Sequence, residues 1–245
     1  AAGYDDARKI FNGMFDKRPA LIVRCAGAAD VLRSVNFART HSLLVAVRGG
    51  GHSLSGQSVC DDGLMIDLSA MRGVRVDTAR RLARADGGAL LGDLDRESLA
   101  FGLVTTTGTV SHTGAGGLTL GGGFGRLSRR FGLTCDQVSS ADVVTADGRL
   151  LQVSADEQPD LFWGIRGGGG NFGIVTTFEY RLHPFDGDAI GGHILYPLDQ
   201  ARHVLRAYAE LFPQAPDGLW IEPILTRLPS GERVLIFDVC YADHK

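Results

Sequence analysis

The sequence predicts an α+β protein in two parts, on three observations. A helical segment at 28–40 lies between apolar stretches at 20–25 and 43–47, which is the pattern of a βαβ unit with parallel strands. Other segments alternate apolar and polar residues, as half-exposed antiparallel strands do. The 34 glycines of the 245-residue chain are clustered and not periodic, so they indicate loops between strands and exclude a fibrous repeat.

The same periodicities predict the individual elements. Apolar residues at helical spacing predict helices at 5–15, 28–40, within 87–103 from near Leu90, and at 198–211. The expected strands are 20–25, 43–47, 64–68, 73–77, 81–85, 139–145, 150–154, 174–182, 219–225 and 233–241, with one more from residue 190. Asp147-Gly148 is a hairpin turn signal. Residues 114–125 hold too many glycines for a long helix, so we expect a loop, a short helix and a loop.

The composition is that of an ordinary globular protein. Hydrophobic residues make up 44% and charged residues 22% of the chain, with a net charge of −3. This charge argues against nucleic acid or an anionic membrane as partner, and no apolar run approaches the ~20 residues that span a bilayer. The four cysteines match neither a zinc pattern nor a dense disulfide framework. We therefore expect buried free thiols, no metal and a cytoplasmic location.

The stretch 43–53, LLVAVRGGGHS, carries the first functional signal. An apolar strand runs into Arg48, three glycines (Gly49, Gly50 and Gly51), His52 and Ser53. Consecutive glycines let a backbone curl until its N–H groups point at one spot, which makes an anion site suited to a pyrophosphate. Arg48 could add a charge, and the His52 imidazole would stand at the rim. The alternative is a glycine-rich surface turn with an exposed histidine.

Further glycine clusters stand at 114–117, 121–123 and 167–170. Residues 168–173 match G-x-G-x-x-G literally, but a strand follows them where a dinucleotide-binding Rossmann motif needs a helix. No Walker P-loop occurs. Ser111 and His112 could belong to a hydrolase, yet the G-x-S-x-G elbow of that class is missing. The clusters instead indicate several backbone loops around one ligand.

The composition changes after His183-Pro184. We expect one domain over 1–185 and a second over 186–245, built on an antiparallel sheet. Such a sheet normally needs further strands and covering helices, so this second domain is expected to be incomplete at Lys245.

Four segments together resemble one family. They are RGGGHS at 48–53, GAGGLTLGGGFG at 114–125, FGLTCDQV at 131–138 and DLFWGIRGGGGNFGIVTTFEYRLHP at 160–184. In this order they resemble the FAD-linked oxidases of the vanillyl-alcohol oxidase / p-cresol methylhydroxylase (PCMH) superfamily. Within it they look like the berberine-bridge-enzyme-like and 6-hydroxy-D-nicotine-oxidase-like branch.

The resemblance implies a two-subdomain PCMH-type FAD-binding domain followed by an antiparallel-sheet substrate domain. It implies FAD bonded covalently through His52, with the 48–53 loop at the pyrophosphate. Further positions expected along the cofactor are Gly108, Thr113, Gly114, Gly116, Gly117, Leu118, Gly121, Gly173, Ile174 and Val175. Many relatives carry a second covalent link from a cysteine at the position of Val110. Valine cannot form a thioether, so we expect a single attachment.

The resemblance also implies the chemistry. We expect an FAD-dependent oxidase that takes hydride from an alcohol or amine C–H of a sugar, amine or alkaloid-like substrate and reduces O₂ to H₂O₂. Thr113 has the volume of the valine found at the oxygen-gating position of oxidases. A dehydrogenase with a quinone or protein acceptor and a non-catalytic flavin-binding protein are the alternatives. The catalytic base is expected beyond Lys245; Tyr196, Glu222 and Tyr241 could line a site, but core or surface roles are favoured.

Overall fold

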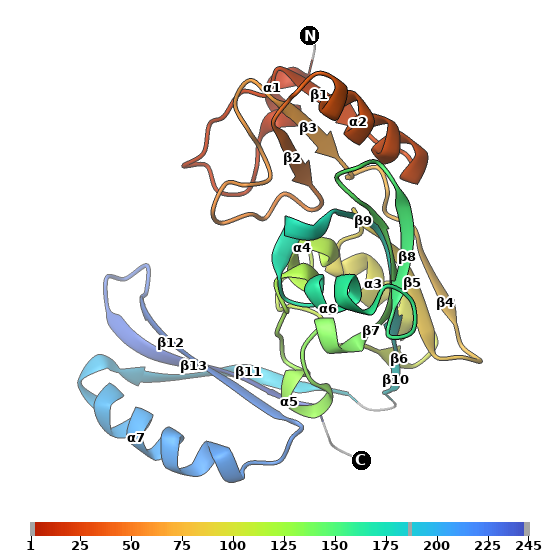
Figure 1. Cartoon of the computed structure of the whole chain (residues 1–245). Helices are drawn as coiled ribbons and strands as arrows, with labels where there is room; N and C mark the ends of the chain where they lie inside the picture. The colour runs from red at the N-terminus through yellow and green to blue at the C-terminus, as the bar shows by residue number, and fades with distance from the viewer. Residues whose placement is uncertain (1–2, 186–187, 243–245) are drawn as a thin grey trace.

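The computed structural model describes residues 3–185 and 188–242, which form three larger sheets, one two-stranded sheet and their covering helices (Figure 1). The first sheet is parallel, in the order β1 (Leu21–Arg24), β3 (Leu64–Asp67), β2 (Val45–Arg48). Helix α2 (Ala28–Thr40) joins β1 to β2 and buries Val31, Val35 and Ala38 against the sheet. The predicted βαβ unit is confirmed, although β3 lies between the two parallel strands.

The second sheet is antiparallel and has five strands. Its order is β4 (Val74–Asp77), β5 (Leu82–Asp86), β9 (Ile174–Arg181), β7 (Val138–Val144) and β8 (Leu150–Ser154). Helices α3 (Leu91–Leu99) and α6 (Pro159–Gly164) pack on it, and the short strands β6 (Leu103–Val104) and β10 (His183–Pro184) pair beside it. Val144 and Ile174 belong to this sheet but pack into the core of the first. These two side chains therefore connect the subdomain built on the first sheet with the subdomain built on the second.

The third sheet is antiparallel, in the order β11 (Ile190–Pro197), β13 (Arg233–Tyr241), β12 (Leu219–Arg227). Helix α7 (Ala201–Leu211) covers one face, packing on Leu235 and Phe237. The opposite face is turned toward the preceding part of the chain (Figure 1), where Asp238 pairs with Arg126 at 2.9 Å. Trp220 stacks on Phe124 there, with ring centroids 6.3 Å apart. The strand–helix–strand–strand order predicted for 190–241 is confirmed.

Short helices complete the described chain: α1 (Tyr4–Arg8), α4 (Ala115–Leu120), α5 (Ser128–Phe131), and 3₁₀ turns at Cys135–Gln137, Gly169–Phe172, Leu198–Gln200 and Phe212–Gln214. The short helix predicted between loops in 114–125 is confirmed as α4. The helix predicted at 5–15 is wrong beyond Arg8, because the next residues fold back onto the first glycine loop. The Phe11 amide donates to Gly51 O at 2.9 Å, and Asn12 Nδ2 donates to Leu54 O at 2.8 Å.

The cysteines are free and buried, as expected. Among the described residues, no helix is both long and apolar enough to cross a bilayer. Within the same ranges, no three His, Cys, Asp or Glu side chains come together as a metal site would require.

The half-buried Asp95 carboxyl gives a prediction about how the stability of the fold depends on pH. Asp95 is half-buried on α3, where Thr107 Oγ1 donates to it at 3.1 Å, and burial raises its pKa to about 6. Because this pKa lies above the ordinary 3.8, the unfolded state loses its proton first, and stability falls as the pH rises from 3.8 to about 6. We expect Asp95→Asn to stabilise the fold by about 1–2 kcal/mol at neutral pH and to change nothing at about pH 3.5. Urea unfolding of both proteins at the two pH values checks this; equal stability at neutral pH would contradict it.

Candidate functional site

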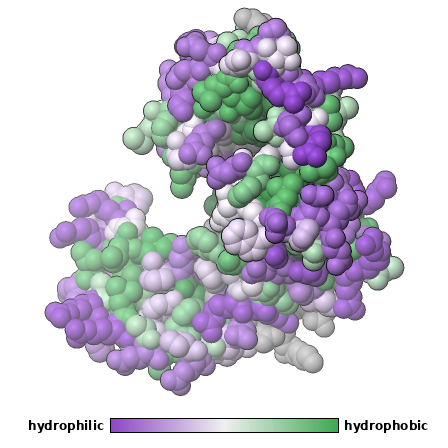
Figure 2. Space-filling model, in the orientation of Figure 1, coloured by the Kyte–Doolittle hydropathy of each residue, from purple (hydrophilic) through white to green (hydrophobic). Residues whose placement is uncertain are grey.

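The glycine-rich bends meet at one cavity of about 780 Å³. It opens between the first sheet and the second, where Figure 2 shows the surface hollowed and partly hydrophobic. The predicted positions that line it are Gly49, Gly50, Gly51, His52, Ser53, Thr113, Gly114, Gly116, Gly117, Leu118, Gly121, Gly173, Ile174 and Val175. Two predicted positions, Arg48 and Gly108, lie outside this lining. The volume is that of a site for a large organic ligand.

The first two glycine bends touch backbone to backbone. A Cβ on Gly50 would lie 2.5 Å from Gly114 Cα, and a Cβ on Gly114 would lie 2.8 Å from Gly50 Cα. Neither glycine has a positive φ. Glycine is therefore required at these two positions because the two backbones approach so closely, and not because of an unusual backbone conformation. The third bend reaches the cavity through Gly173, whose φ of +142° favours glycine.

Unused backbone N–H groups line the cavity. In the described part of the chain, no acceptor takes a hydrogen bond from the amides of Gly49–Ser53, or from those of Gly116 and Gly117 in the first turn of α4. All of these residues except Gly117 are buried or half-buried. Such amides are normally paired, so these donors suit an anionic ligand. Gly117 adds open space, because a Cβ there would meet nothing within 4 Å. The bends thus form a cradle for phosphate oxygens.

His52 stands in this lining between two other rings. Phe11 stacks on its imidazole at 4.4 Å with the planes 12° apart, and the His112 ring lies 4.7 Å away. Thr113 Oγ1 is 3.5 Å from His52 Nδ1. Burial, and secondly the neighbouring His112, lower the pKa of His52 below its ordinary 6.5. At neutral pH the imidazole is therefore uncharged, and one ring nitrogen keeps a free electron pair.

Arg48 holds the loop from outside the cavity. Its guanidinium binds the Asp67 carboxylate with both Nε (3.1 Å) and Nη2 (2.6 Å), and it donates to Lys9 O at 3.1 Å. Asp67 has no exposed surface. Burial alone would raise the pKa of Asp67, but hydrogen bonds from Arg48 and from the Ser69 amide hold it below its ordinary value. The sequence-based role of Arg48 as a charge facing a phosphate is therefore replaced by a role in fixing the loop.

Gly108 serves the packing beneath the loops. A Cβ at this position would lie 2.9 Å from Leu91 Cδ1 and 3.4 Å from Leu118 Cδ1. The glycine lets the chain pass close to α3 and α4, so its contribution to the cavity is indirect.

The third sheet supplies none of the cavity lining. Tyr196 packs edge-on against Phe237 beneath α7, which is a core position. Glu222 lies opposite Asp238 in the strand register, and Tyr241 lies opposite Leu219. Val110, the position where the resemblance implies a cysteine in many relatives, is 42% exposed.

Sequence reasoning missed several lining residues. They are Lys17, residues 44–47 of the edge strand β2 and its approach, residues 57–60, Leu68, Gly87, Leu120, Asn171 and Phe178. Gly169 and Gly170 also line the cavity and belong to the 167–170 cluster that the sequence assigns to a ligand loop. The signal for 44–47 was available, since these residues lead directly into the glycine loop. Lys17 lies in a distant segment, and no motif marks it.

Comparison with known proteins identifies the family. The model of an FAD binding domain (FAD_binding_4) matches residues 19–154, more than half of the chain. The chain belongs to this family of FAD-binding domains. Within it, the relatives place the chain in the berberine-bridge-enzyme-like branch of the vanillyl-alcohol oxidase / PCMH superfamily, among the FAD-linked oxidoreductases.

Three matches support this placement. (R)-6-hydroxynicotine oxidase of Paenarthrobacter nicotinovorans is 40% identical over 195 residues, covering 80% of this chain and 43% of the relative. The crystal structure of 6-hydroxy-D-nicotine oxidase from Arthrobacter nicotinovorans has a TM-score of 0.94 at 33% identity, covering all of this chain and 54% of that one. Berberine-bridge-enzyme-like 1 of Physcomitrella patens has a TM-score of 0.91 at 26% identity, covering 100% and 53%. The chain thus spans about half the length of the relatives it matches.

The PCMH-type fold predicted from the motifs is confirmed. The residues also fit FAD as a ligand, because the space over Gly117 is open and the unpaired amides of the bends can donate to phosphate oxygens.

Proposed function

We propose that the cavity binds FAD along its glycine bends and that the protein is an oxidase for small molecules. The observation that carries the proposal is the convergence of three separate bends on one cavity with a neutral imidazole in its wall. The amides of Gly49–Ser53, Gly116 and Gly117 bind the pyrophosphate and compensate part of its charge.

His52 is the proposed point of covalent attachment. Its ring is fixed between Phe11 and His112, so little conformational freedom is lost when it forms a bond. Its lowered pKa keeps a ring nitrogen available at neutral pH to bond the 8-methyl carbon of the flavin. This bond would replace one methyl C–H and the imidazole N–H, with the two protons lost to water and the two electrons taken by the flavin and passed to O₂. Val110 offers no thiol, so His52 is the single attachment.

Bound FAD supplies the redox chemistry, accepting hydride from a substrate C–H and passing the electrons to O₂. The protein positions the cofactor and sets its electronic environment. The similarity to a hydroxynicotine oxidase supports an amine- or alkaloid-like substrate, the similarity to a xylooligosaccharide oxidase supports a sugar, and oxygen is the proposed acceptor.

The experiment is anaerobic titration of the yellow protein with sugars, secondary amines and alkaloids, followed by mixing with air in a stopped-flow instrument. An oxidase loses its flavin absorbance with substrate and regains it in air, with formation of H₂O₂. Bleaching that persists in air would show a dehydrogenase with another acceptor. Colour that no substrate bleaches would support a flavin-binding protein and contradict the proposal.

Thr113 gives a prediction on oxygen access. It lines the cavity beside His52, and its side chain has the volume of valine. We expect Thr113→Leu to slow reoxidation in air about tenfold, which corresponds to ~1.4 kcal/mol, while Thr113→Val keeps the rate. Stopped-flow reoxidation measures both variants. A Leu variant that reoxidises as fast as the parent protein would show that volume at this position does not control oxygen.

A further inference from the structure

Lys17 and Ser58 both line the cavity, and Lys17 Nζ hydrogen-bonds to Gly56 and Val59, on either side of Ser58 in the chain, so we call the two residues one corner of the cavity. Of the described residues that line the cavity, Lys17 is the one lysine or arginine, and none of them is Asp or Glu. A single cation in an otherwise uncharged lining marks the place where an anionic part of a ligand gains most.

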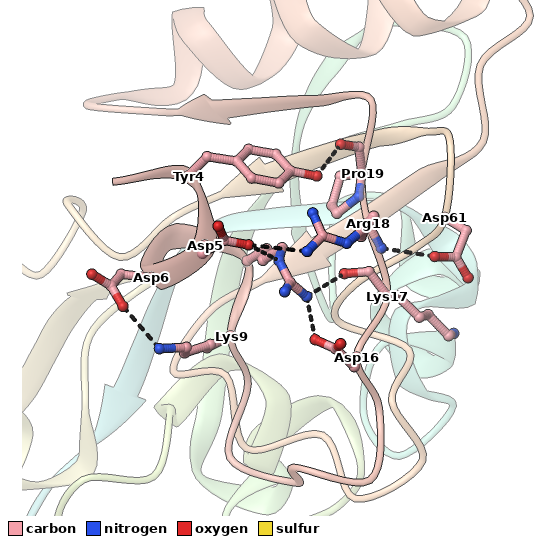
Figure 3. A network of polar contacts seen from close by, with 10 residues as sticks. Tyr4, Asp5, Asp6, Lys9, Asp16, Lys17, Arg18, Pro19 and Asp61 are labelled. Carbon is pink, nitrogen blue, oxygen red and sulfur yellow. Dashed lines mark hydrogen bonds and ion pairs between the residues drawn. The ribbon is translucent and has the colours of Figure 1, made fainter. Parts of the chain in front are cut away.

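Lys17 is held by the N-terminal segment (Figure 3). The guanidinium of Arg8, which is 7% exposed, binds Asp5 at 2.8 Å, binds Asp16, and donates to the Lys17 carbonyl at 3.2 Å. Beside it, the Arg18 amide donates to Asp61 at 2.7 Å. These contacts fix the backbone of Lys17, and its side chain runs away from them.

The Lys17 ammonium is only partly used within the protein. Nζ donates to Gly56 O at 3.2 Å and to Val59 O at 3.4 Å. The Phe15 ring centroid lies 5.7 Å from Nζ. An ammonium carries three N–H donors, and the third has no hydrogen-bond acceptor in the described part of the chain, so it can bind a ligand in the cavity that Lys17 lines. Both acceptors belong to the loop that follows the first glycine bend.

Ser58 lies within this loop and provides an independent observation. Ser58 is 8% exposed, and its hydroxyl has no hydrogen-bond partner within the described ranges 3–185 and 188–242. Buried polar groups nearly always have a partner, and leaving one unpaired is costly. Because Ser58 lines the cavity, a bound ligand can supply the missing partner.

We propose that Lys17 and Ser58 bind the adenosine diphosphate half of FAD, with the ammonium neutralising phosphate charge and the hydroxyl hydrogen-bonded to the same half. The inference depends on the proposed function, which places the flavin half at His52. Since all anionic charge of FAD is in its pyrophosphate, the one cationic side chain of the lining belongs to that part. This corner then selects FAD over riboflavin, which has no phosphate.

The test uses the full chain carrying His52→Ala, so that the cofactor is removable, and calorimetric titration with ADP and with adenosine. We expect Lys17→Gln to weaken ADP binding roughly tenfold, to reduce its salt dependence and to leave adenosine unaffected. Lys17→Arg keeps the charge and restores ADP affinity to within about threefold. Lys9→Gln is the matched control, because Lys9 Nζ pairs with Asp6 outside this cavity.

Ser58→Ala separates ligand binding from a structural role. It removes an unpaired buried hydroxyl, so the ligand-free protein should be as stable as the parent or more so, while ADP binds roughly three- to tenfold more weakly. Ser55→Ala, an exposed serine of the same loop, should change neither property. Thermal unfolding with and without ADP measures both effects.

Unchanged ADP affinity in both Lys17→Gln and Ser58→Ala would overturn the inference. The inference would also be overturned if the variants lost ADP affinity only in proportion to a loss of stability without ligand, and if Lys17→Arg did not restore that affinity. If the protein with His52 still carries FAD in these cases, the proposed function stands and only the role of this corner fails. If neither FAD nor ADP binds to any form, both proposals fail.

Discussion

Placing a methyl group on either of two touching glycines should disrupt the cavity. We expect Gly50→Ala and Gly114→Ala each to destabilise the protein by at least about 3 kcal/mol, because each methyl would meet the backbone of the other bend. In a chain of 245 residues this lowers the midpoint of thermal unfolding by roughly 6–12 °C. The flavin content should fall with it, since both bends line the cavity. Thermal unfolding followed by circular dichroism, with flavin absorbance per chain, measures both.

Gly117 provides the matched control. A Cβ there would meet no other atom within 4 Å beyond the helix's own backbone, and a longer side chain would extend into the cradle. Gly117→Leu should therefore fold as stably as the parent chain, since leucine is the better helix former, and should lose more than about nine-tenths of its FAD. If Gly117→Leu retained full flavin, or if Gly114→Ala unfolded at the parent temperature, the assignment of these bends would be wrong.

The second large effect is expected at the Arg48–Asp67 pair. Arg48→Met leaves a fully buried carboxylate with the Ser69 amide and with Arg24, which is 3.6 Å away and mostly exposed. Breaking a buried pair costs about 3–5 kcal/mol, so we expect a loss of that order at neutral pH. Because the pair fixes the start of the glycine loop, the fraction of chains with bound FAD should fall as well.

The pH dependence identifies the cause. In the parent protein the pKa of Asp67 is lowered, so its contribution is present above 3.8 and is lost as the pH falls through the folded-state pKa. Without Arg48, burial raises that pKa, and the carboxylate destabilises the variant as the pH rises. The difference in unfolding free energy between the parent protein and Arg48→Met should therefore grow from about pH 3 to pH 7. The double variant Arg48→Met/Asp67→Asn should regain most of the lost stability. A gap independent of pH in urea unfolding would contradict this account.

Much of the fold follows from local patterns. The 28–40 helix, the Asp147-Gly148 hairpin and the antiparallel strands of 219–241 are set by periodicity and turn chemistry, which act within a few residues. The strand order of the first sheet does not follow from local patterns. Strand β3 lies between β1 and β2 because it pairs with residues at least 19 positions away in the sequence. The early end of α1 is also a tertiary effect, since the Phe11 amide is bonded to Gly51.

The candidate site was likewise predictable only in part from the sequence. The glycine clusters and His52 are visible in the sequence because close backbone approach requires glycine, which is rarely gathered in such runs. The partners of these residues are not visible. Arg48 reads as a phosphate ligand until its distance to Asp67 is known, and Lys17 and Ser58 reach the cavity from segments without a motif. Charge pairing and unpaired hydroxyls are properties of the folded chain alone.

The most direct test of the central claim is peptide mass spectrometry of the protein purified with its flavin and precipitated in acid. The yellow colour should stay with the precipitate, and the peptide containing His52 should carry the added mass of one FAD, with every other peptide unmodified. FAD released into the acid supernatant, or found attached to a different residue, would contradict the claim that this imidazole tethers the cofactor.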